Sequence, residues 1–330
     1  MNNFLPYFPD FIMSSIADAA STELPLPTTA WQLFRALTSG ALTPGLAWKN
    51  PAYRRKFLLR SLCTPISTAS YLARLAKLPQ LAQILQVQPG LPCRLHRPWL
   101  SININREQAA NALCWHYENT LQRLPVALTH AYLSKTGADL AILNGKDEQT
   151  YFLRLCTNAM QDKEGEATLA FCDAQQTTLA ELTFTLCPFA GKNTLYIGGL
   201  QGAKAHVPHE LIQSATKACH GLFPKRLLVE AAMTLGQFLA VDEIRAVSNE
   251  THIYRSVRYR RKKQGKLHAD YNSFWESLGA VADSHGDFVL PPVMPRKSME
   301  EIASKKRAEY RRRYELLDSL HAQTAHRCQN

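Results

Sequence analysis

Apolar residues recur at helical spacing through the first third of the chain. Each of four segments places apolar side chains three or four positions apart among polar ones, which is the pattern of an amphipathic helix. These segments are residues 29–40, 51–62, 67–85 and 106–124. Gly40 suits the C-cap of the first helix, and Pro79 should break or kink the third. We therefore predict a mostly helical region over residues 1–125.

The period of the pattern changes at about residue 126. The segments that follow are short, rich in strand-forming residues, and separated by turn signals such as Asn144-Gly145 and Lys163-Glu164-Gly165. They are residues 126–134, 150–159, 166–174, 178–187 and 193–202. We predict that these segments form an antiparallel meander, and that a further strand over residues 94–102 joins it.

Helical spacing returns after residue 207. It occurs in residues 208–221, 224–241, 269–281 and 298–323. Pro224 opens the second of these segments at a first-turn position that tolerates proline. Ser298 and Glu301 form a capping box at the start of the last one. Strands are expected over residues 243–249 and 286–290.

The predicted fold class is α+β. A mainly helical N-terminal region, residues 1–125, is followed over residues 126–330 by a mixed, largely antiparallel sheet with flanking helices, and the two parts can pack as one unit. The order of elements after residue 126 resembles the core of the GNAT acyltransferase fold. In that fold two neighbouring strands diverge, the pantetheine arm of an acyl-CoA pairs with the freed backbone, and the pyrophosphate lies at the start of the next helix.

A donor site of this kind has candidate residues at two places. Glycines end the strand at "GGLQG", and "HGLFPKRLL" (220–228) places a glycine and two cations around the start of a helix, where free N–H groups attract an anion. The candidate cofactor-binding residues are Gln201, Gly202, Gly221, Lys225 and Arg226. The alternative is a helix–helix turn with basic residues facing solvent.

The sequence departs from the GNAT pattern after Gln201. The usual loop is Q/R-x-x-G-x-G/A, and Lys204 stands where its first glycine belongs. A predicted helix is also inserted before Pro224. Either the phosphate-binding loop has moved to residues 220–226, or the CoA site is absent.

A second group of candidates follows the strand predicted at 243–249. His252 is a candidate general base near neutral pH, Tyr254 a proton donor to a leaving thiolate, and Asp270 a nearby carboxylate. Asn249, Tyr271 and Trp275 are candidates to wall the substrate pocket. The alternative for each residue is a capped turn or a buried aromatic side chain.

Charge is unevenly spread along the chain. The formal net charge is +11, with +7 over residues 1–100, −3 over 101–250 and +7 over 251–330. Seven basic residues crowd into "RSVRYRRKKQGK" (255–266). Candidate anion-binding residues there are Arg258, Arg260, Arg261, Lys262 and Lys263. The run suits phosphates of nucleic acid or an anionic lipid surface, but no nucleic-acid-binding motif accompanies it. The alternative is an exposed loop.

The cysteines and the N-terminus indicate the compartment. None of the eight cysteines forms a C-x-x-C pair, so we expect neither a zinc site nor a disulfide framework. The apolar start of the chain has no basic region before it and is broken by Pro6 and Pro9, which makes a poor signal peptide. We expect a cytoplasmic protein, with peripheral attachment to the inner membrane as an option.

Four motifs carry a resemblance to a known family. They are "YIGGLQG" (196–202), "HGLFPKRLLVE" (220–230), "AVSNETH" (246–252) and "DYNSFWESLG" (270–279). In this order they resemble the VirK/YbjX family of bacterial proteins, best from about 190 to 315. The resemblance implies a domain of unknown function, a bacterial origin and a context tied to virulence and the cell envelope. It implies no reaction.

Different classes of function stay open, and with them the question whether the protein is an enzyme. The first is a GNAT-like acyltransferase that moves an acyl group from an acyl-CoA or similar donor to an envelope-related amine or hydroxyl, with His252 as the base and no metal. The second is a non-catalytic factor that binds an anionic lipid surface, or less favourably nucleic acid, through residues 255–266. A third is an acyltransferase fold used only for protein–protein contact.

Overall fold

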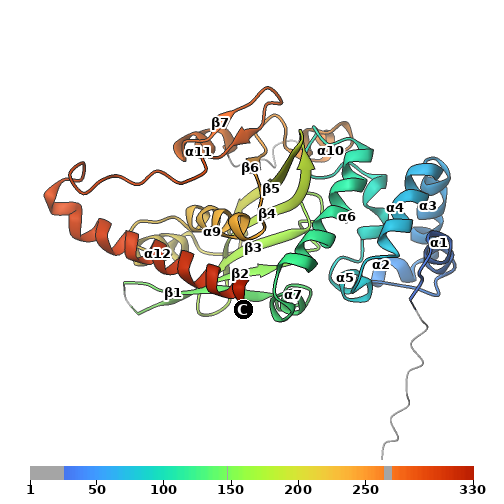
Figure 1. The fold of residues 1–330 in the computed structure, drawn as a ribbon, viewed down its shortest axis with the longest axis horizontal. Coiled ribbons are helices and arrows are strands. Elements are labelled where there is room, and N and C mark those ends of the chain that lie inside the picture. The colour runs from blue at the N-terminus through green and yellow to red at the C-terminus, as the bar shows by residue number, and fades with distance from the viewer. Residues whose placement is uncertain (1–25, 147, 264–269) are drawn as a thin grey trace, which may run out of the picture.

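A computed structural model gives the structure of residues 26–146, 148–263 and 270–330. Helices come first. The N-terminal helices are α1 (Ala30–Ser39), α2 (Leu46–Lys49), α3 (Pro51–Leu62), α4 (Pro65–Leu75), α5 (Leu81–Val87), the 3₁₀ helix η1 (Leu91–His96), α6 (Arg106–Arg123) and α7 (Val126–Tyr132). In Figure 1 the helices α1–α5 gather at one end of the molecule, whereas α6 runs beside the sheet and α7 lies next to β2 (Thr150–Cys156).

The predicted helix boundaries in this region are confirmed. Thr29 and Gln32 form a capping box at the start of α1, and Gly40 ends the helix with a φ of 90°, which favours glycine. Pro79 lies between α4 and α5, as expected from its effect on a continuous helix.

One sheet follows. Its strands are β1 (Ala138–Asn144), β2 (Thr150–Cys156), β3 (Ala167–Cys172), β4 (Thr178–Phe189), β5 (Lys192–Gly202), β6 (Glu243–Ala246), β7 (Val281–Ala282) and β8 (Phe288–Val289). Their order is β1-β2-β3-β4-β5-β6-β8-β7. Neighbouring strands are antiparallel except for β5 and β6, which are parallel. The predicted mixed, largely antiparallel sheet is therefore confirmed.

Three predicted elements are wrong. Residues 126–134 form α7 instead of a strand, and the first strand is β1, which the prediction missed. Residues 94–102 are not a strand either, because η1 covers 91–96 and a loop follows. The last helix, α12 (Arg307–Gln329), begins nine residues after Ser298. The Glu301 carboxylate does accept the Ser298 N–H, but this bond closes a turn outside the helix.

Both faces of the sheet are covered by helices. Every residue of β3 is buried, which requires cover on both sides. Between β5 and β6 come α8 (His209–Ala218) and α9 (Pro224–Phe238), and α9 packs on β3, β4 and β5. The long α12 packs on α9 and β1, while α6 packs on β4 and joins the sheet to the N-terminal helices.

β5 and β6 separate beyond their short parallel pairing. The register runs from Thr194 opposite Glu243 to Ile197 opposite Ala246, and β5 then continues to Gly202 paired with β4 but not with β6. The helix α11 (Tyr271–Ser277) closes the gap. The Leu200 N–H donates to the Tyr271 hydroxyl at 3.1 Å, and the Trp275 indole N–H donates to the Val247 carbonyl at 2.9 Å.

A buried arginine ties the helical part to the sheet. Arg94 of η1 is fully buried, and its guanidinium lies 2.9 Å from the Glu166 carboxylate and 2.7 Å from that of Asp162. The Gln88 side chain accepts a further bond from it at 3.0 Å. Burial acts to lower the pKa of Arg94, but the two carboxylates outweigh burial and raise it. Arg94 therefore stays charged and connects η1 to the segment that leads into β3.

Arg94→Ala should lower the free energy of unfolding by about 3–5 kcal/mol, because it leaves the buried Glu166 carboxylate without its cation. Urea denaturation followed by circular dichroism measures the change. Arg74→Ala is the control, since Arg74 pairs with Glu118 at the surface and such pairs contribute about 0–1 kcal/mol. Equal losses in the two variants would show that Arg94 has no special role.

His116 should make stability depend on pH. It is buried in α6, its Nδ1 accepts the Leu186 N–H at 3.1 Å, and its Nε2 lies 2.9 Å from the Tyr132 hydroxyl. Burial lowers its pKa to about 3, against about 6.5 in an unfolded chain. Between these values the unfolded state binds a proton that the native state does not. Stability present above pH 6.5 is therefore lost as the pH falls, by on the order of 2 kcal/mol at pH 5.

The comparison of His116→Phe with the unaltered chain tests this effect by urea denaturation at pH 7 and pH 5. The variant should lose less stability between the two pH values, although it is weaker at pH 7 because two hydrogen bonds are gone. His130→Phe, at an exposed position of α7, should keep the full pH dependence. An unchanged dependence in His116→Phe would refute the assignment.

Candidate functional site

The glycine pair of "YIGGLQG" lies against a buried carboxylate. A Cβ at Gly198 would overlap the Glu164 carbonyl oxygen, and a Cβ at Gly199 would overlap Oε2 of the Glu164 side chain. Neither glycine has a positive φ, so close approach rather than turn geometry requires them. The pair therefore makes room for Glu164, and this accounts for both glycines without a bound phosphate.

Glu164 is the centre of a polar cluster at the point where β5 and β6 separate. Its side chain is 1% exposed. Its Oε2 accepts a hydrogen bond from the Gln201 side chain at 2.7 Å, and its Oε1 lies 3.8 Å from Nε2 of His252. We call Glu164, Gln201, His252, Tyr254 and Tyr271 the Glu164 cluster.

His252 is held on several sides. Its ring stacks on Tyr271 at 5.4 Å and meets the Tyr254 ring edge-on at 4.6 Å. The Tyr254 backbone N–H donates to Nδ1 of His252 at 3.2 Å. In the neutral ring the proton is therefore on Nε2, the nitrogen that faces Glu164.

The two tyrosines are held in the protonated form. Burial, and then the charge of Glu164, raises the pKa of Tyr271. The same two causes, with a hydrogen bond to Glu164, raise the pKa of Tyr254. Tyr254 and Gln201 are half-buried, whereas Glu164 and His252 are buried. Tyr254 and Gln201 are thus the members of the cluster that reach the surface.

The Glu164 cluster contains four of the predicted site residues, namely Gln201, His252, Tyr254 and Tyr271. The other three candidates predicted to follow the strand at 243–249 lie beside the cluster: Asn249, Asp270 and Trp275. Asp270 is exposed and caps α11, where it accepts the Ser273 N–H at 3.2 Å and a bond from the Asn249 side chain at 3.0 Å. Trp275 is fully buried in the gap between β5 and β6. These contacts give Asp270 and Trp275 structural roles, and their catalytic and pocket roles stay predictions.

The predicted donor residues fall into two places. A Cβ at Gly202 would lie 3.9 Å from the Lys225 side chain, so the end of β5 does meet the start of α9. Burial lowers the pKa of Lys225. Arg226 instead pairs with Glu230 at 2.7 Å, and a Cβ at Gly221 would lie 2.6 Å from the Arg313 guanidinium of α12.

Part of the basic run 255–266 forms the short helix α10 (Val257–Lys263). Arg258 donates to the His96 carbonyl at 2.8 Å, so it faces η1. Arg260 and Arg261 are exposed. Residues 264–269 lie outside the described residues, and so do the side chains of Lys262 and Lys263.

Glu164 itself was not among the predicted site residues. Lys163-Glu164-Gly165 served only as a turn signal, which it is, since Gly165 has a φ of 155° and no room for a Cβ against Phe184. An acidic residue in a turn is ordinarily solvated. The only sequence feature that pointed to Glu164 was the glycine pair Gly198-Gly199 of β5. It indicated that another part of the chain packs closely there, but it did not identify that part.

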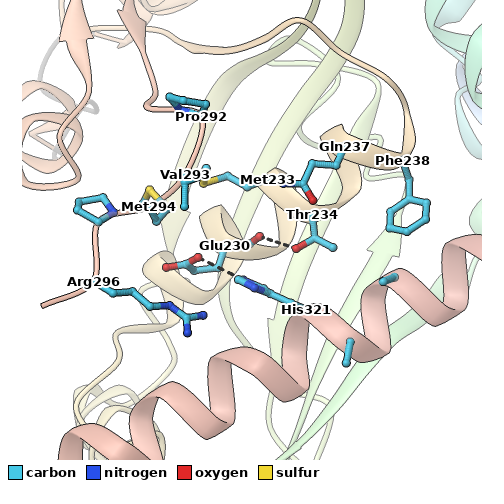
Figure 2. A pocket seen from close by; sticks show the side chains of 13 residues that line it. Glu230, Met233, Thr234, Gln237, Phe238, Pro292, Val293, Met294, Arg296 and His321 are labelled. Atoms are coloured by element: carbon cyan, nitrogen blue, oxygen red, sulfur yellow. Dashed lines mark hydrogen bonds and ion pairs between the residues drawn. The ribbon is translucent and has the colours of Figure 1, made fainter. Parts of the chain in front are cut away.

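A hollow lies elsewhere, between α9, α12 and the segment 292–296 (Figure 2). Its volume is about 760 Å³. Its charged groups are paired within the chain: Glu230 lies 3.3 Å from His321, as Figure 2 shows, and Arg296 pairs with Asp318 at 2.7 Å. Burial acts to raise the pKa of Glu230, but His321 and Arg226 outweigh burial and lower it. Glu230 is therefore held ionised, in ion pairs with His321 and Arg226.

Metal ligands and membrane-spanning helices can be assessed over the part of the chain that the structure describes. It holds no group of three or more His, Cys, Asp or Glu side chains arranged to bind a metal ion. None of its helices combines the length and the apolar character needed to cross a bilayer.

Comparison with known proteins confirms the family resemblance. A sequence model of the family described as "Protein of unknown function (DUF535)" matches residues 47–326. The uncharacterized protein YbjX of Escherichia coli (strain K12) is 50% identical over 293 residues, which cover 89% of this chain and 88% of that protein. An uncharacterized protein of Haemophilus influenzae (strain ATCC 51907 / DSM 11121 / KW20 / Rd) is 31% identical over 169 residues, 51% of this chain and 55% of that protein. No solved structure matches the chain, so the likeness to acyltransferases stays a prediction.

Gly199→Ala should displace the Glu164 side chain, because the new methyl group needs the place of its carboxylate. We expect a loss of about 1–3 kcal/mol in unfolding free energy, the usual cost of overpacking. Thermal denaturation measures it. Gly202→Ala is the control, since its Cβ would make only an ordinary contact with Lys225, and it should shift stability by less than about 0.5 kcal/mol. A Gly199→Ala variant as stable as the control would contradict the close approach.

Proposed function

The chain belongs to the DUF535 family, whose description assigns no activity, and we propose that it is an acyltransferase with the Glu164 cluster as its reactive centre. One observation carries the proposal. A buried carboxylate faces a buried imidazole where two parallel strands separate. Burying such groups costs several kcal/mol per ion, and groups of this kind are found preferentially at functional sites.

Tyr254 is the group that we expect to meet the acceptor. Its side chain is half-buried, and its hydroxyl hydrogen-bonds to Glu164. As the acceptor amine or hydroxyl attacks the acyl carbon, its proton passes to the Tyr254 oxygen while the Tyr254 proton passes to Glu164. The bond from carbon to the leaving thiol breaks, and the thiolate takes the proton back by the same route.

His252 acts in this scheme as a positioning residue. Its Nδ1 is occupied by the Tyr254 N–H and its Nε2 faces Glu164, so both nitrogens point into the protein. The role of general base, expected at His252 from the sequence, therefore passes to Glu164 in our proposal. His252 orients the carboxylate and stabilises its charge.

The donor would be an acyl-CoA or a similar acyl carrier. Lys225 and the free N–H groups at the start of α9 offer a place for its phosphates beside Gly202. Tyr271 and Trp275 fill the gap in which the pantetheine arm lies in a GNAT enzyme. A donor bound in that manner needs α11 to move. The acceptor, in line with the family context, would be an envelope component.

One observation favours a second function, attachment of a non-catalytic factor to an anionic lipid surface or nucleic acid. Three exposed arginines lie within one stretch of seven residues that runs from the end of η2 (Ile253–Arg255) into α10: Arg255, Arg260 and Arg261. Such a group binds phosphates through charge and loses affinity as salt rises. Strong salt dependence without any acyl transfer would favour this function over the first.

Tyr254→Phe should lower the rate of acyl transfer by on the order of 10²- to 10⁴-fold while the fold is kept, because it removes only the hydroxyl that relays the proton. The assay follows release of free thiol from acetyl-CoA and longer acyl-CoAs in the presence of amine and hydroxyl acceptors. Glu164→Gln should have a similar effect. Tyr314→Phe is the matched control, since the Tyr314 hydroxyl donates to the Lys297 carbonyl and Tyr314 is not part of the Glu164 cluster.

The outcome that counts against the proposal is a folded Tyr254→Phe variant with the activity of the unaltered chain. Absence of thiol release with every donor, together with no rise in melting temperature on adding CoA, would also count against it. A bound ligand at 100 times its dissociation constant stabilises a fold by about 2.7 kcal/mol, so the shift is measurable.

A further inference from the structure

A smaller cavity opens where three distant parts of the chain meet. It lies between η1, the first turn of α6 and α10, and Figure 1 shows α10 beside the end of α6 at which that helix begins. Its volume is about 380 Å³. Six lining residues carry polar side chains, and we call their site the arginine cavity: His96, Arg97, Trp99, Asn105, Arg106 and Arg258.

The arginine cavity concentrates positive charge. Three of its residues are arginines, and among the described residues that line it none carries a carboxylate. Arg97 is held by Asp162, which leaves Arg106 and Arg258 to face the cavity with their charge less compensated. The positive end of the 18-residue helix α6 also lies here, because Asn105 is its N-cap.

Several buried donors in the cavity have no acceptor in the described structure. Trp99 is 2% exposed, and its indole nitrogen has no hydrogen-bond partner there. The same holds for both ring nitrogens of His96 and for Nε of Arg97. A buried polar group without a partner costs free energy, so an acceptor from outside the chain would be favoured here.

His96 shows the sign of the local field. Burial, and then the nearby charges of Arg60, Arg106 and Arg258, lowers its pKa to about 4. At neutral pH its ring is uncharged and carries one N–H that can donate. An anion in the cavity would offset the repulsion that these cations exert on His96.

We propose that the arginine cavity binds the phosphate group of a phosphate ester. A phosphate has oxygens on several sides, which matches donors that come from η1, α6 and α10 at once. Arg106 and Arg258 supply charged N–H groups suited to phosphate, and Trp99 supplies a neutral one. The volume leaves room for part of the esterified group. This proposal does not depend on acyl transfer.

Isothermal titration calorimetry of the full chain tests the site with three probes. They are inorganic phosphate, glycerol 3-phosphate, and phosphatidylcholine vesicles with and without phosphatidic acid. Arg258→Gln should raise the dissociation constant for the binding probe at least tenfold. Arg123→Gln, which removes an exposed charge from the last turn of α6, at the opposite end of that helix from the cavity, is the control and should change it less than twofold.

The probes also separate the two sources of phosphate. Binding of glycerol 3-phosphate indicates a soluble ester, and binding only of vesicles that contain phosphatidic acid indicates a lipid headgroup; both support the site if Arg258→Gln weakens them. If Arg258→Gln does not fold, Trp99→Phe replaces it, because it removes the indole N–H and keeps an aromatic ring. No heat with any probe overturns the proposal, as does a folded test variant that binds like the unaltered chain. An equal loss in Arg123→Gln also overturns it, since net charge alone would then explain binding.

Discussion

The buried charge of Arg94 is the constraint on which the rest of this structure depends. A guanidinium without water requires carboxylates around it, and both come from one short segment, at Asp162 and Glu166. Since Arg94 belongs to the N-terminal helices and that segment leads into β3, the ion pairs fix the helical part on the sheet. The apolar core is continuous across the same boundary, so the two predicted regions share one interior. The ion pairs of Arg94 add directional contacts to the non-directional apolar packing, and they fix the position of the turn between Asp162 and Glu166.

That turn carries Glu164. With Asp162 and Glu166 both bound to Arg94, the residue midway between them is turned toward β5, where Gly198 and Gly199 leave space for it. The Glu164 cluster is therefore built from four separate parts of the chain: a turn, the end of β5, the loop that holds His252, and α11. The buried Glu164 carboxylate depends on these contacts, because burying a charge without partners costs free energy.

Sequence reasoning succeeded where local physics decides. Capping residues, prolines and strand periodicity gave most helices and the sheet from β2 to β6, and the family resemblance is confirmed. It failed at α7, where tertiary packing made a helix of a segment rich in strand formers, and at Ser298, whose local capping bond did not start a helix. His252 and Tyr254 were found because they follow a strand, but Glu164 was not, because its partners are distant in sequence and a turn acid gives no local sign of burial.

Because α11 closes the gap between β5 and β6, a ligand that binds in this gap must overcome the free-energy cost of displacing that helix. Two backbone groups that a neighbouring strand would normally satisfy are bonded instead by Tyr271 and Trp275, so the chain supplies its own substitute for a bound arm. Displacing α11 breaks these two hydrogen bonds, each of which contributes about 0.5–1.5 kcal/mol to stability. It also exposes the fully buried Trp275 indole to water. The open form is then a minor population, and the apparent affinity of such a ligand is reduced in proportion to that population. Occupancy would therefore be selective, because only a ligand that replaces both bonds recovers the free energy of opening.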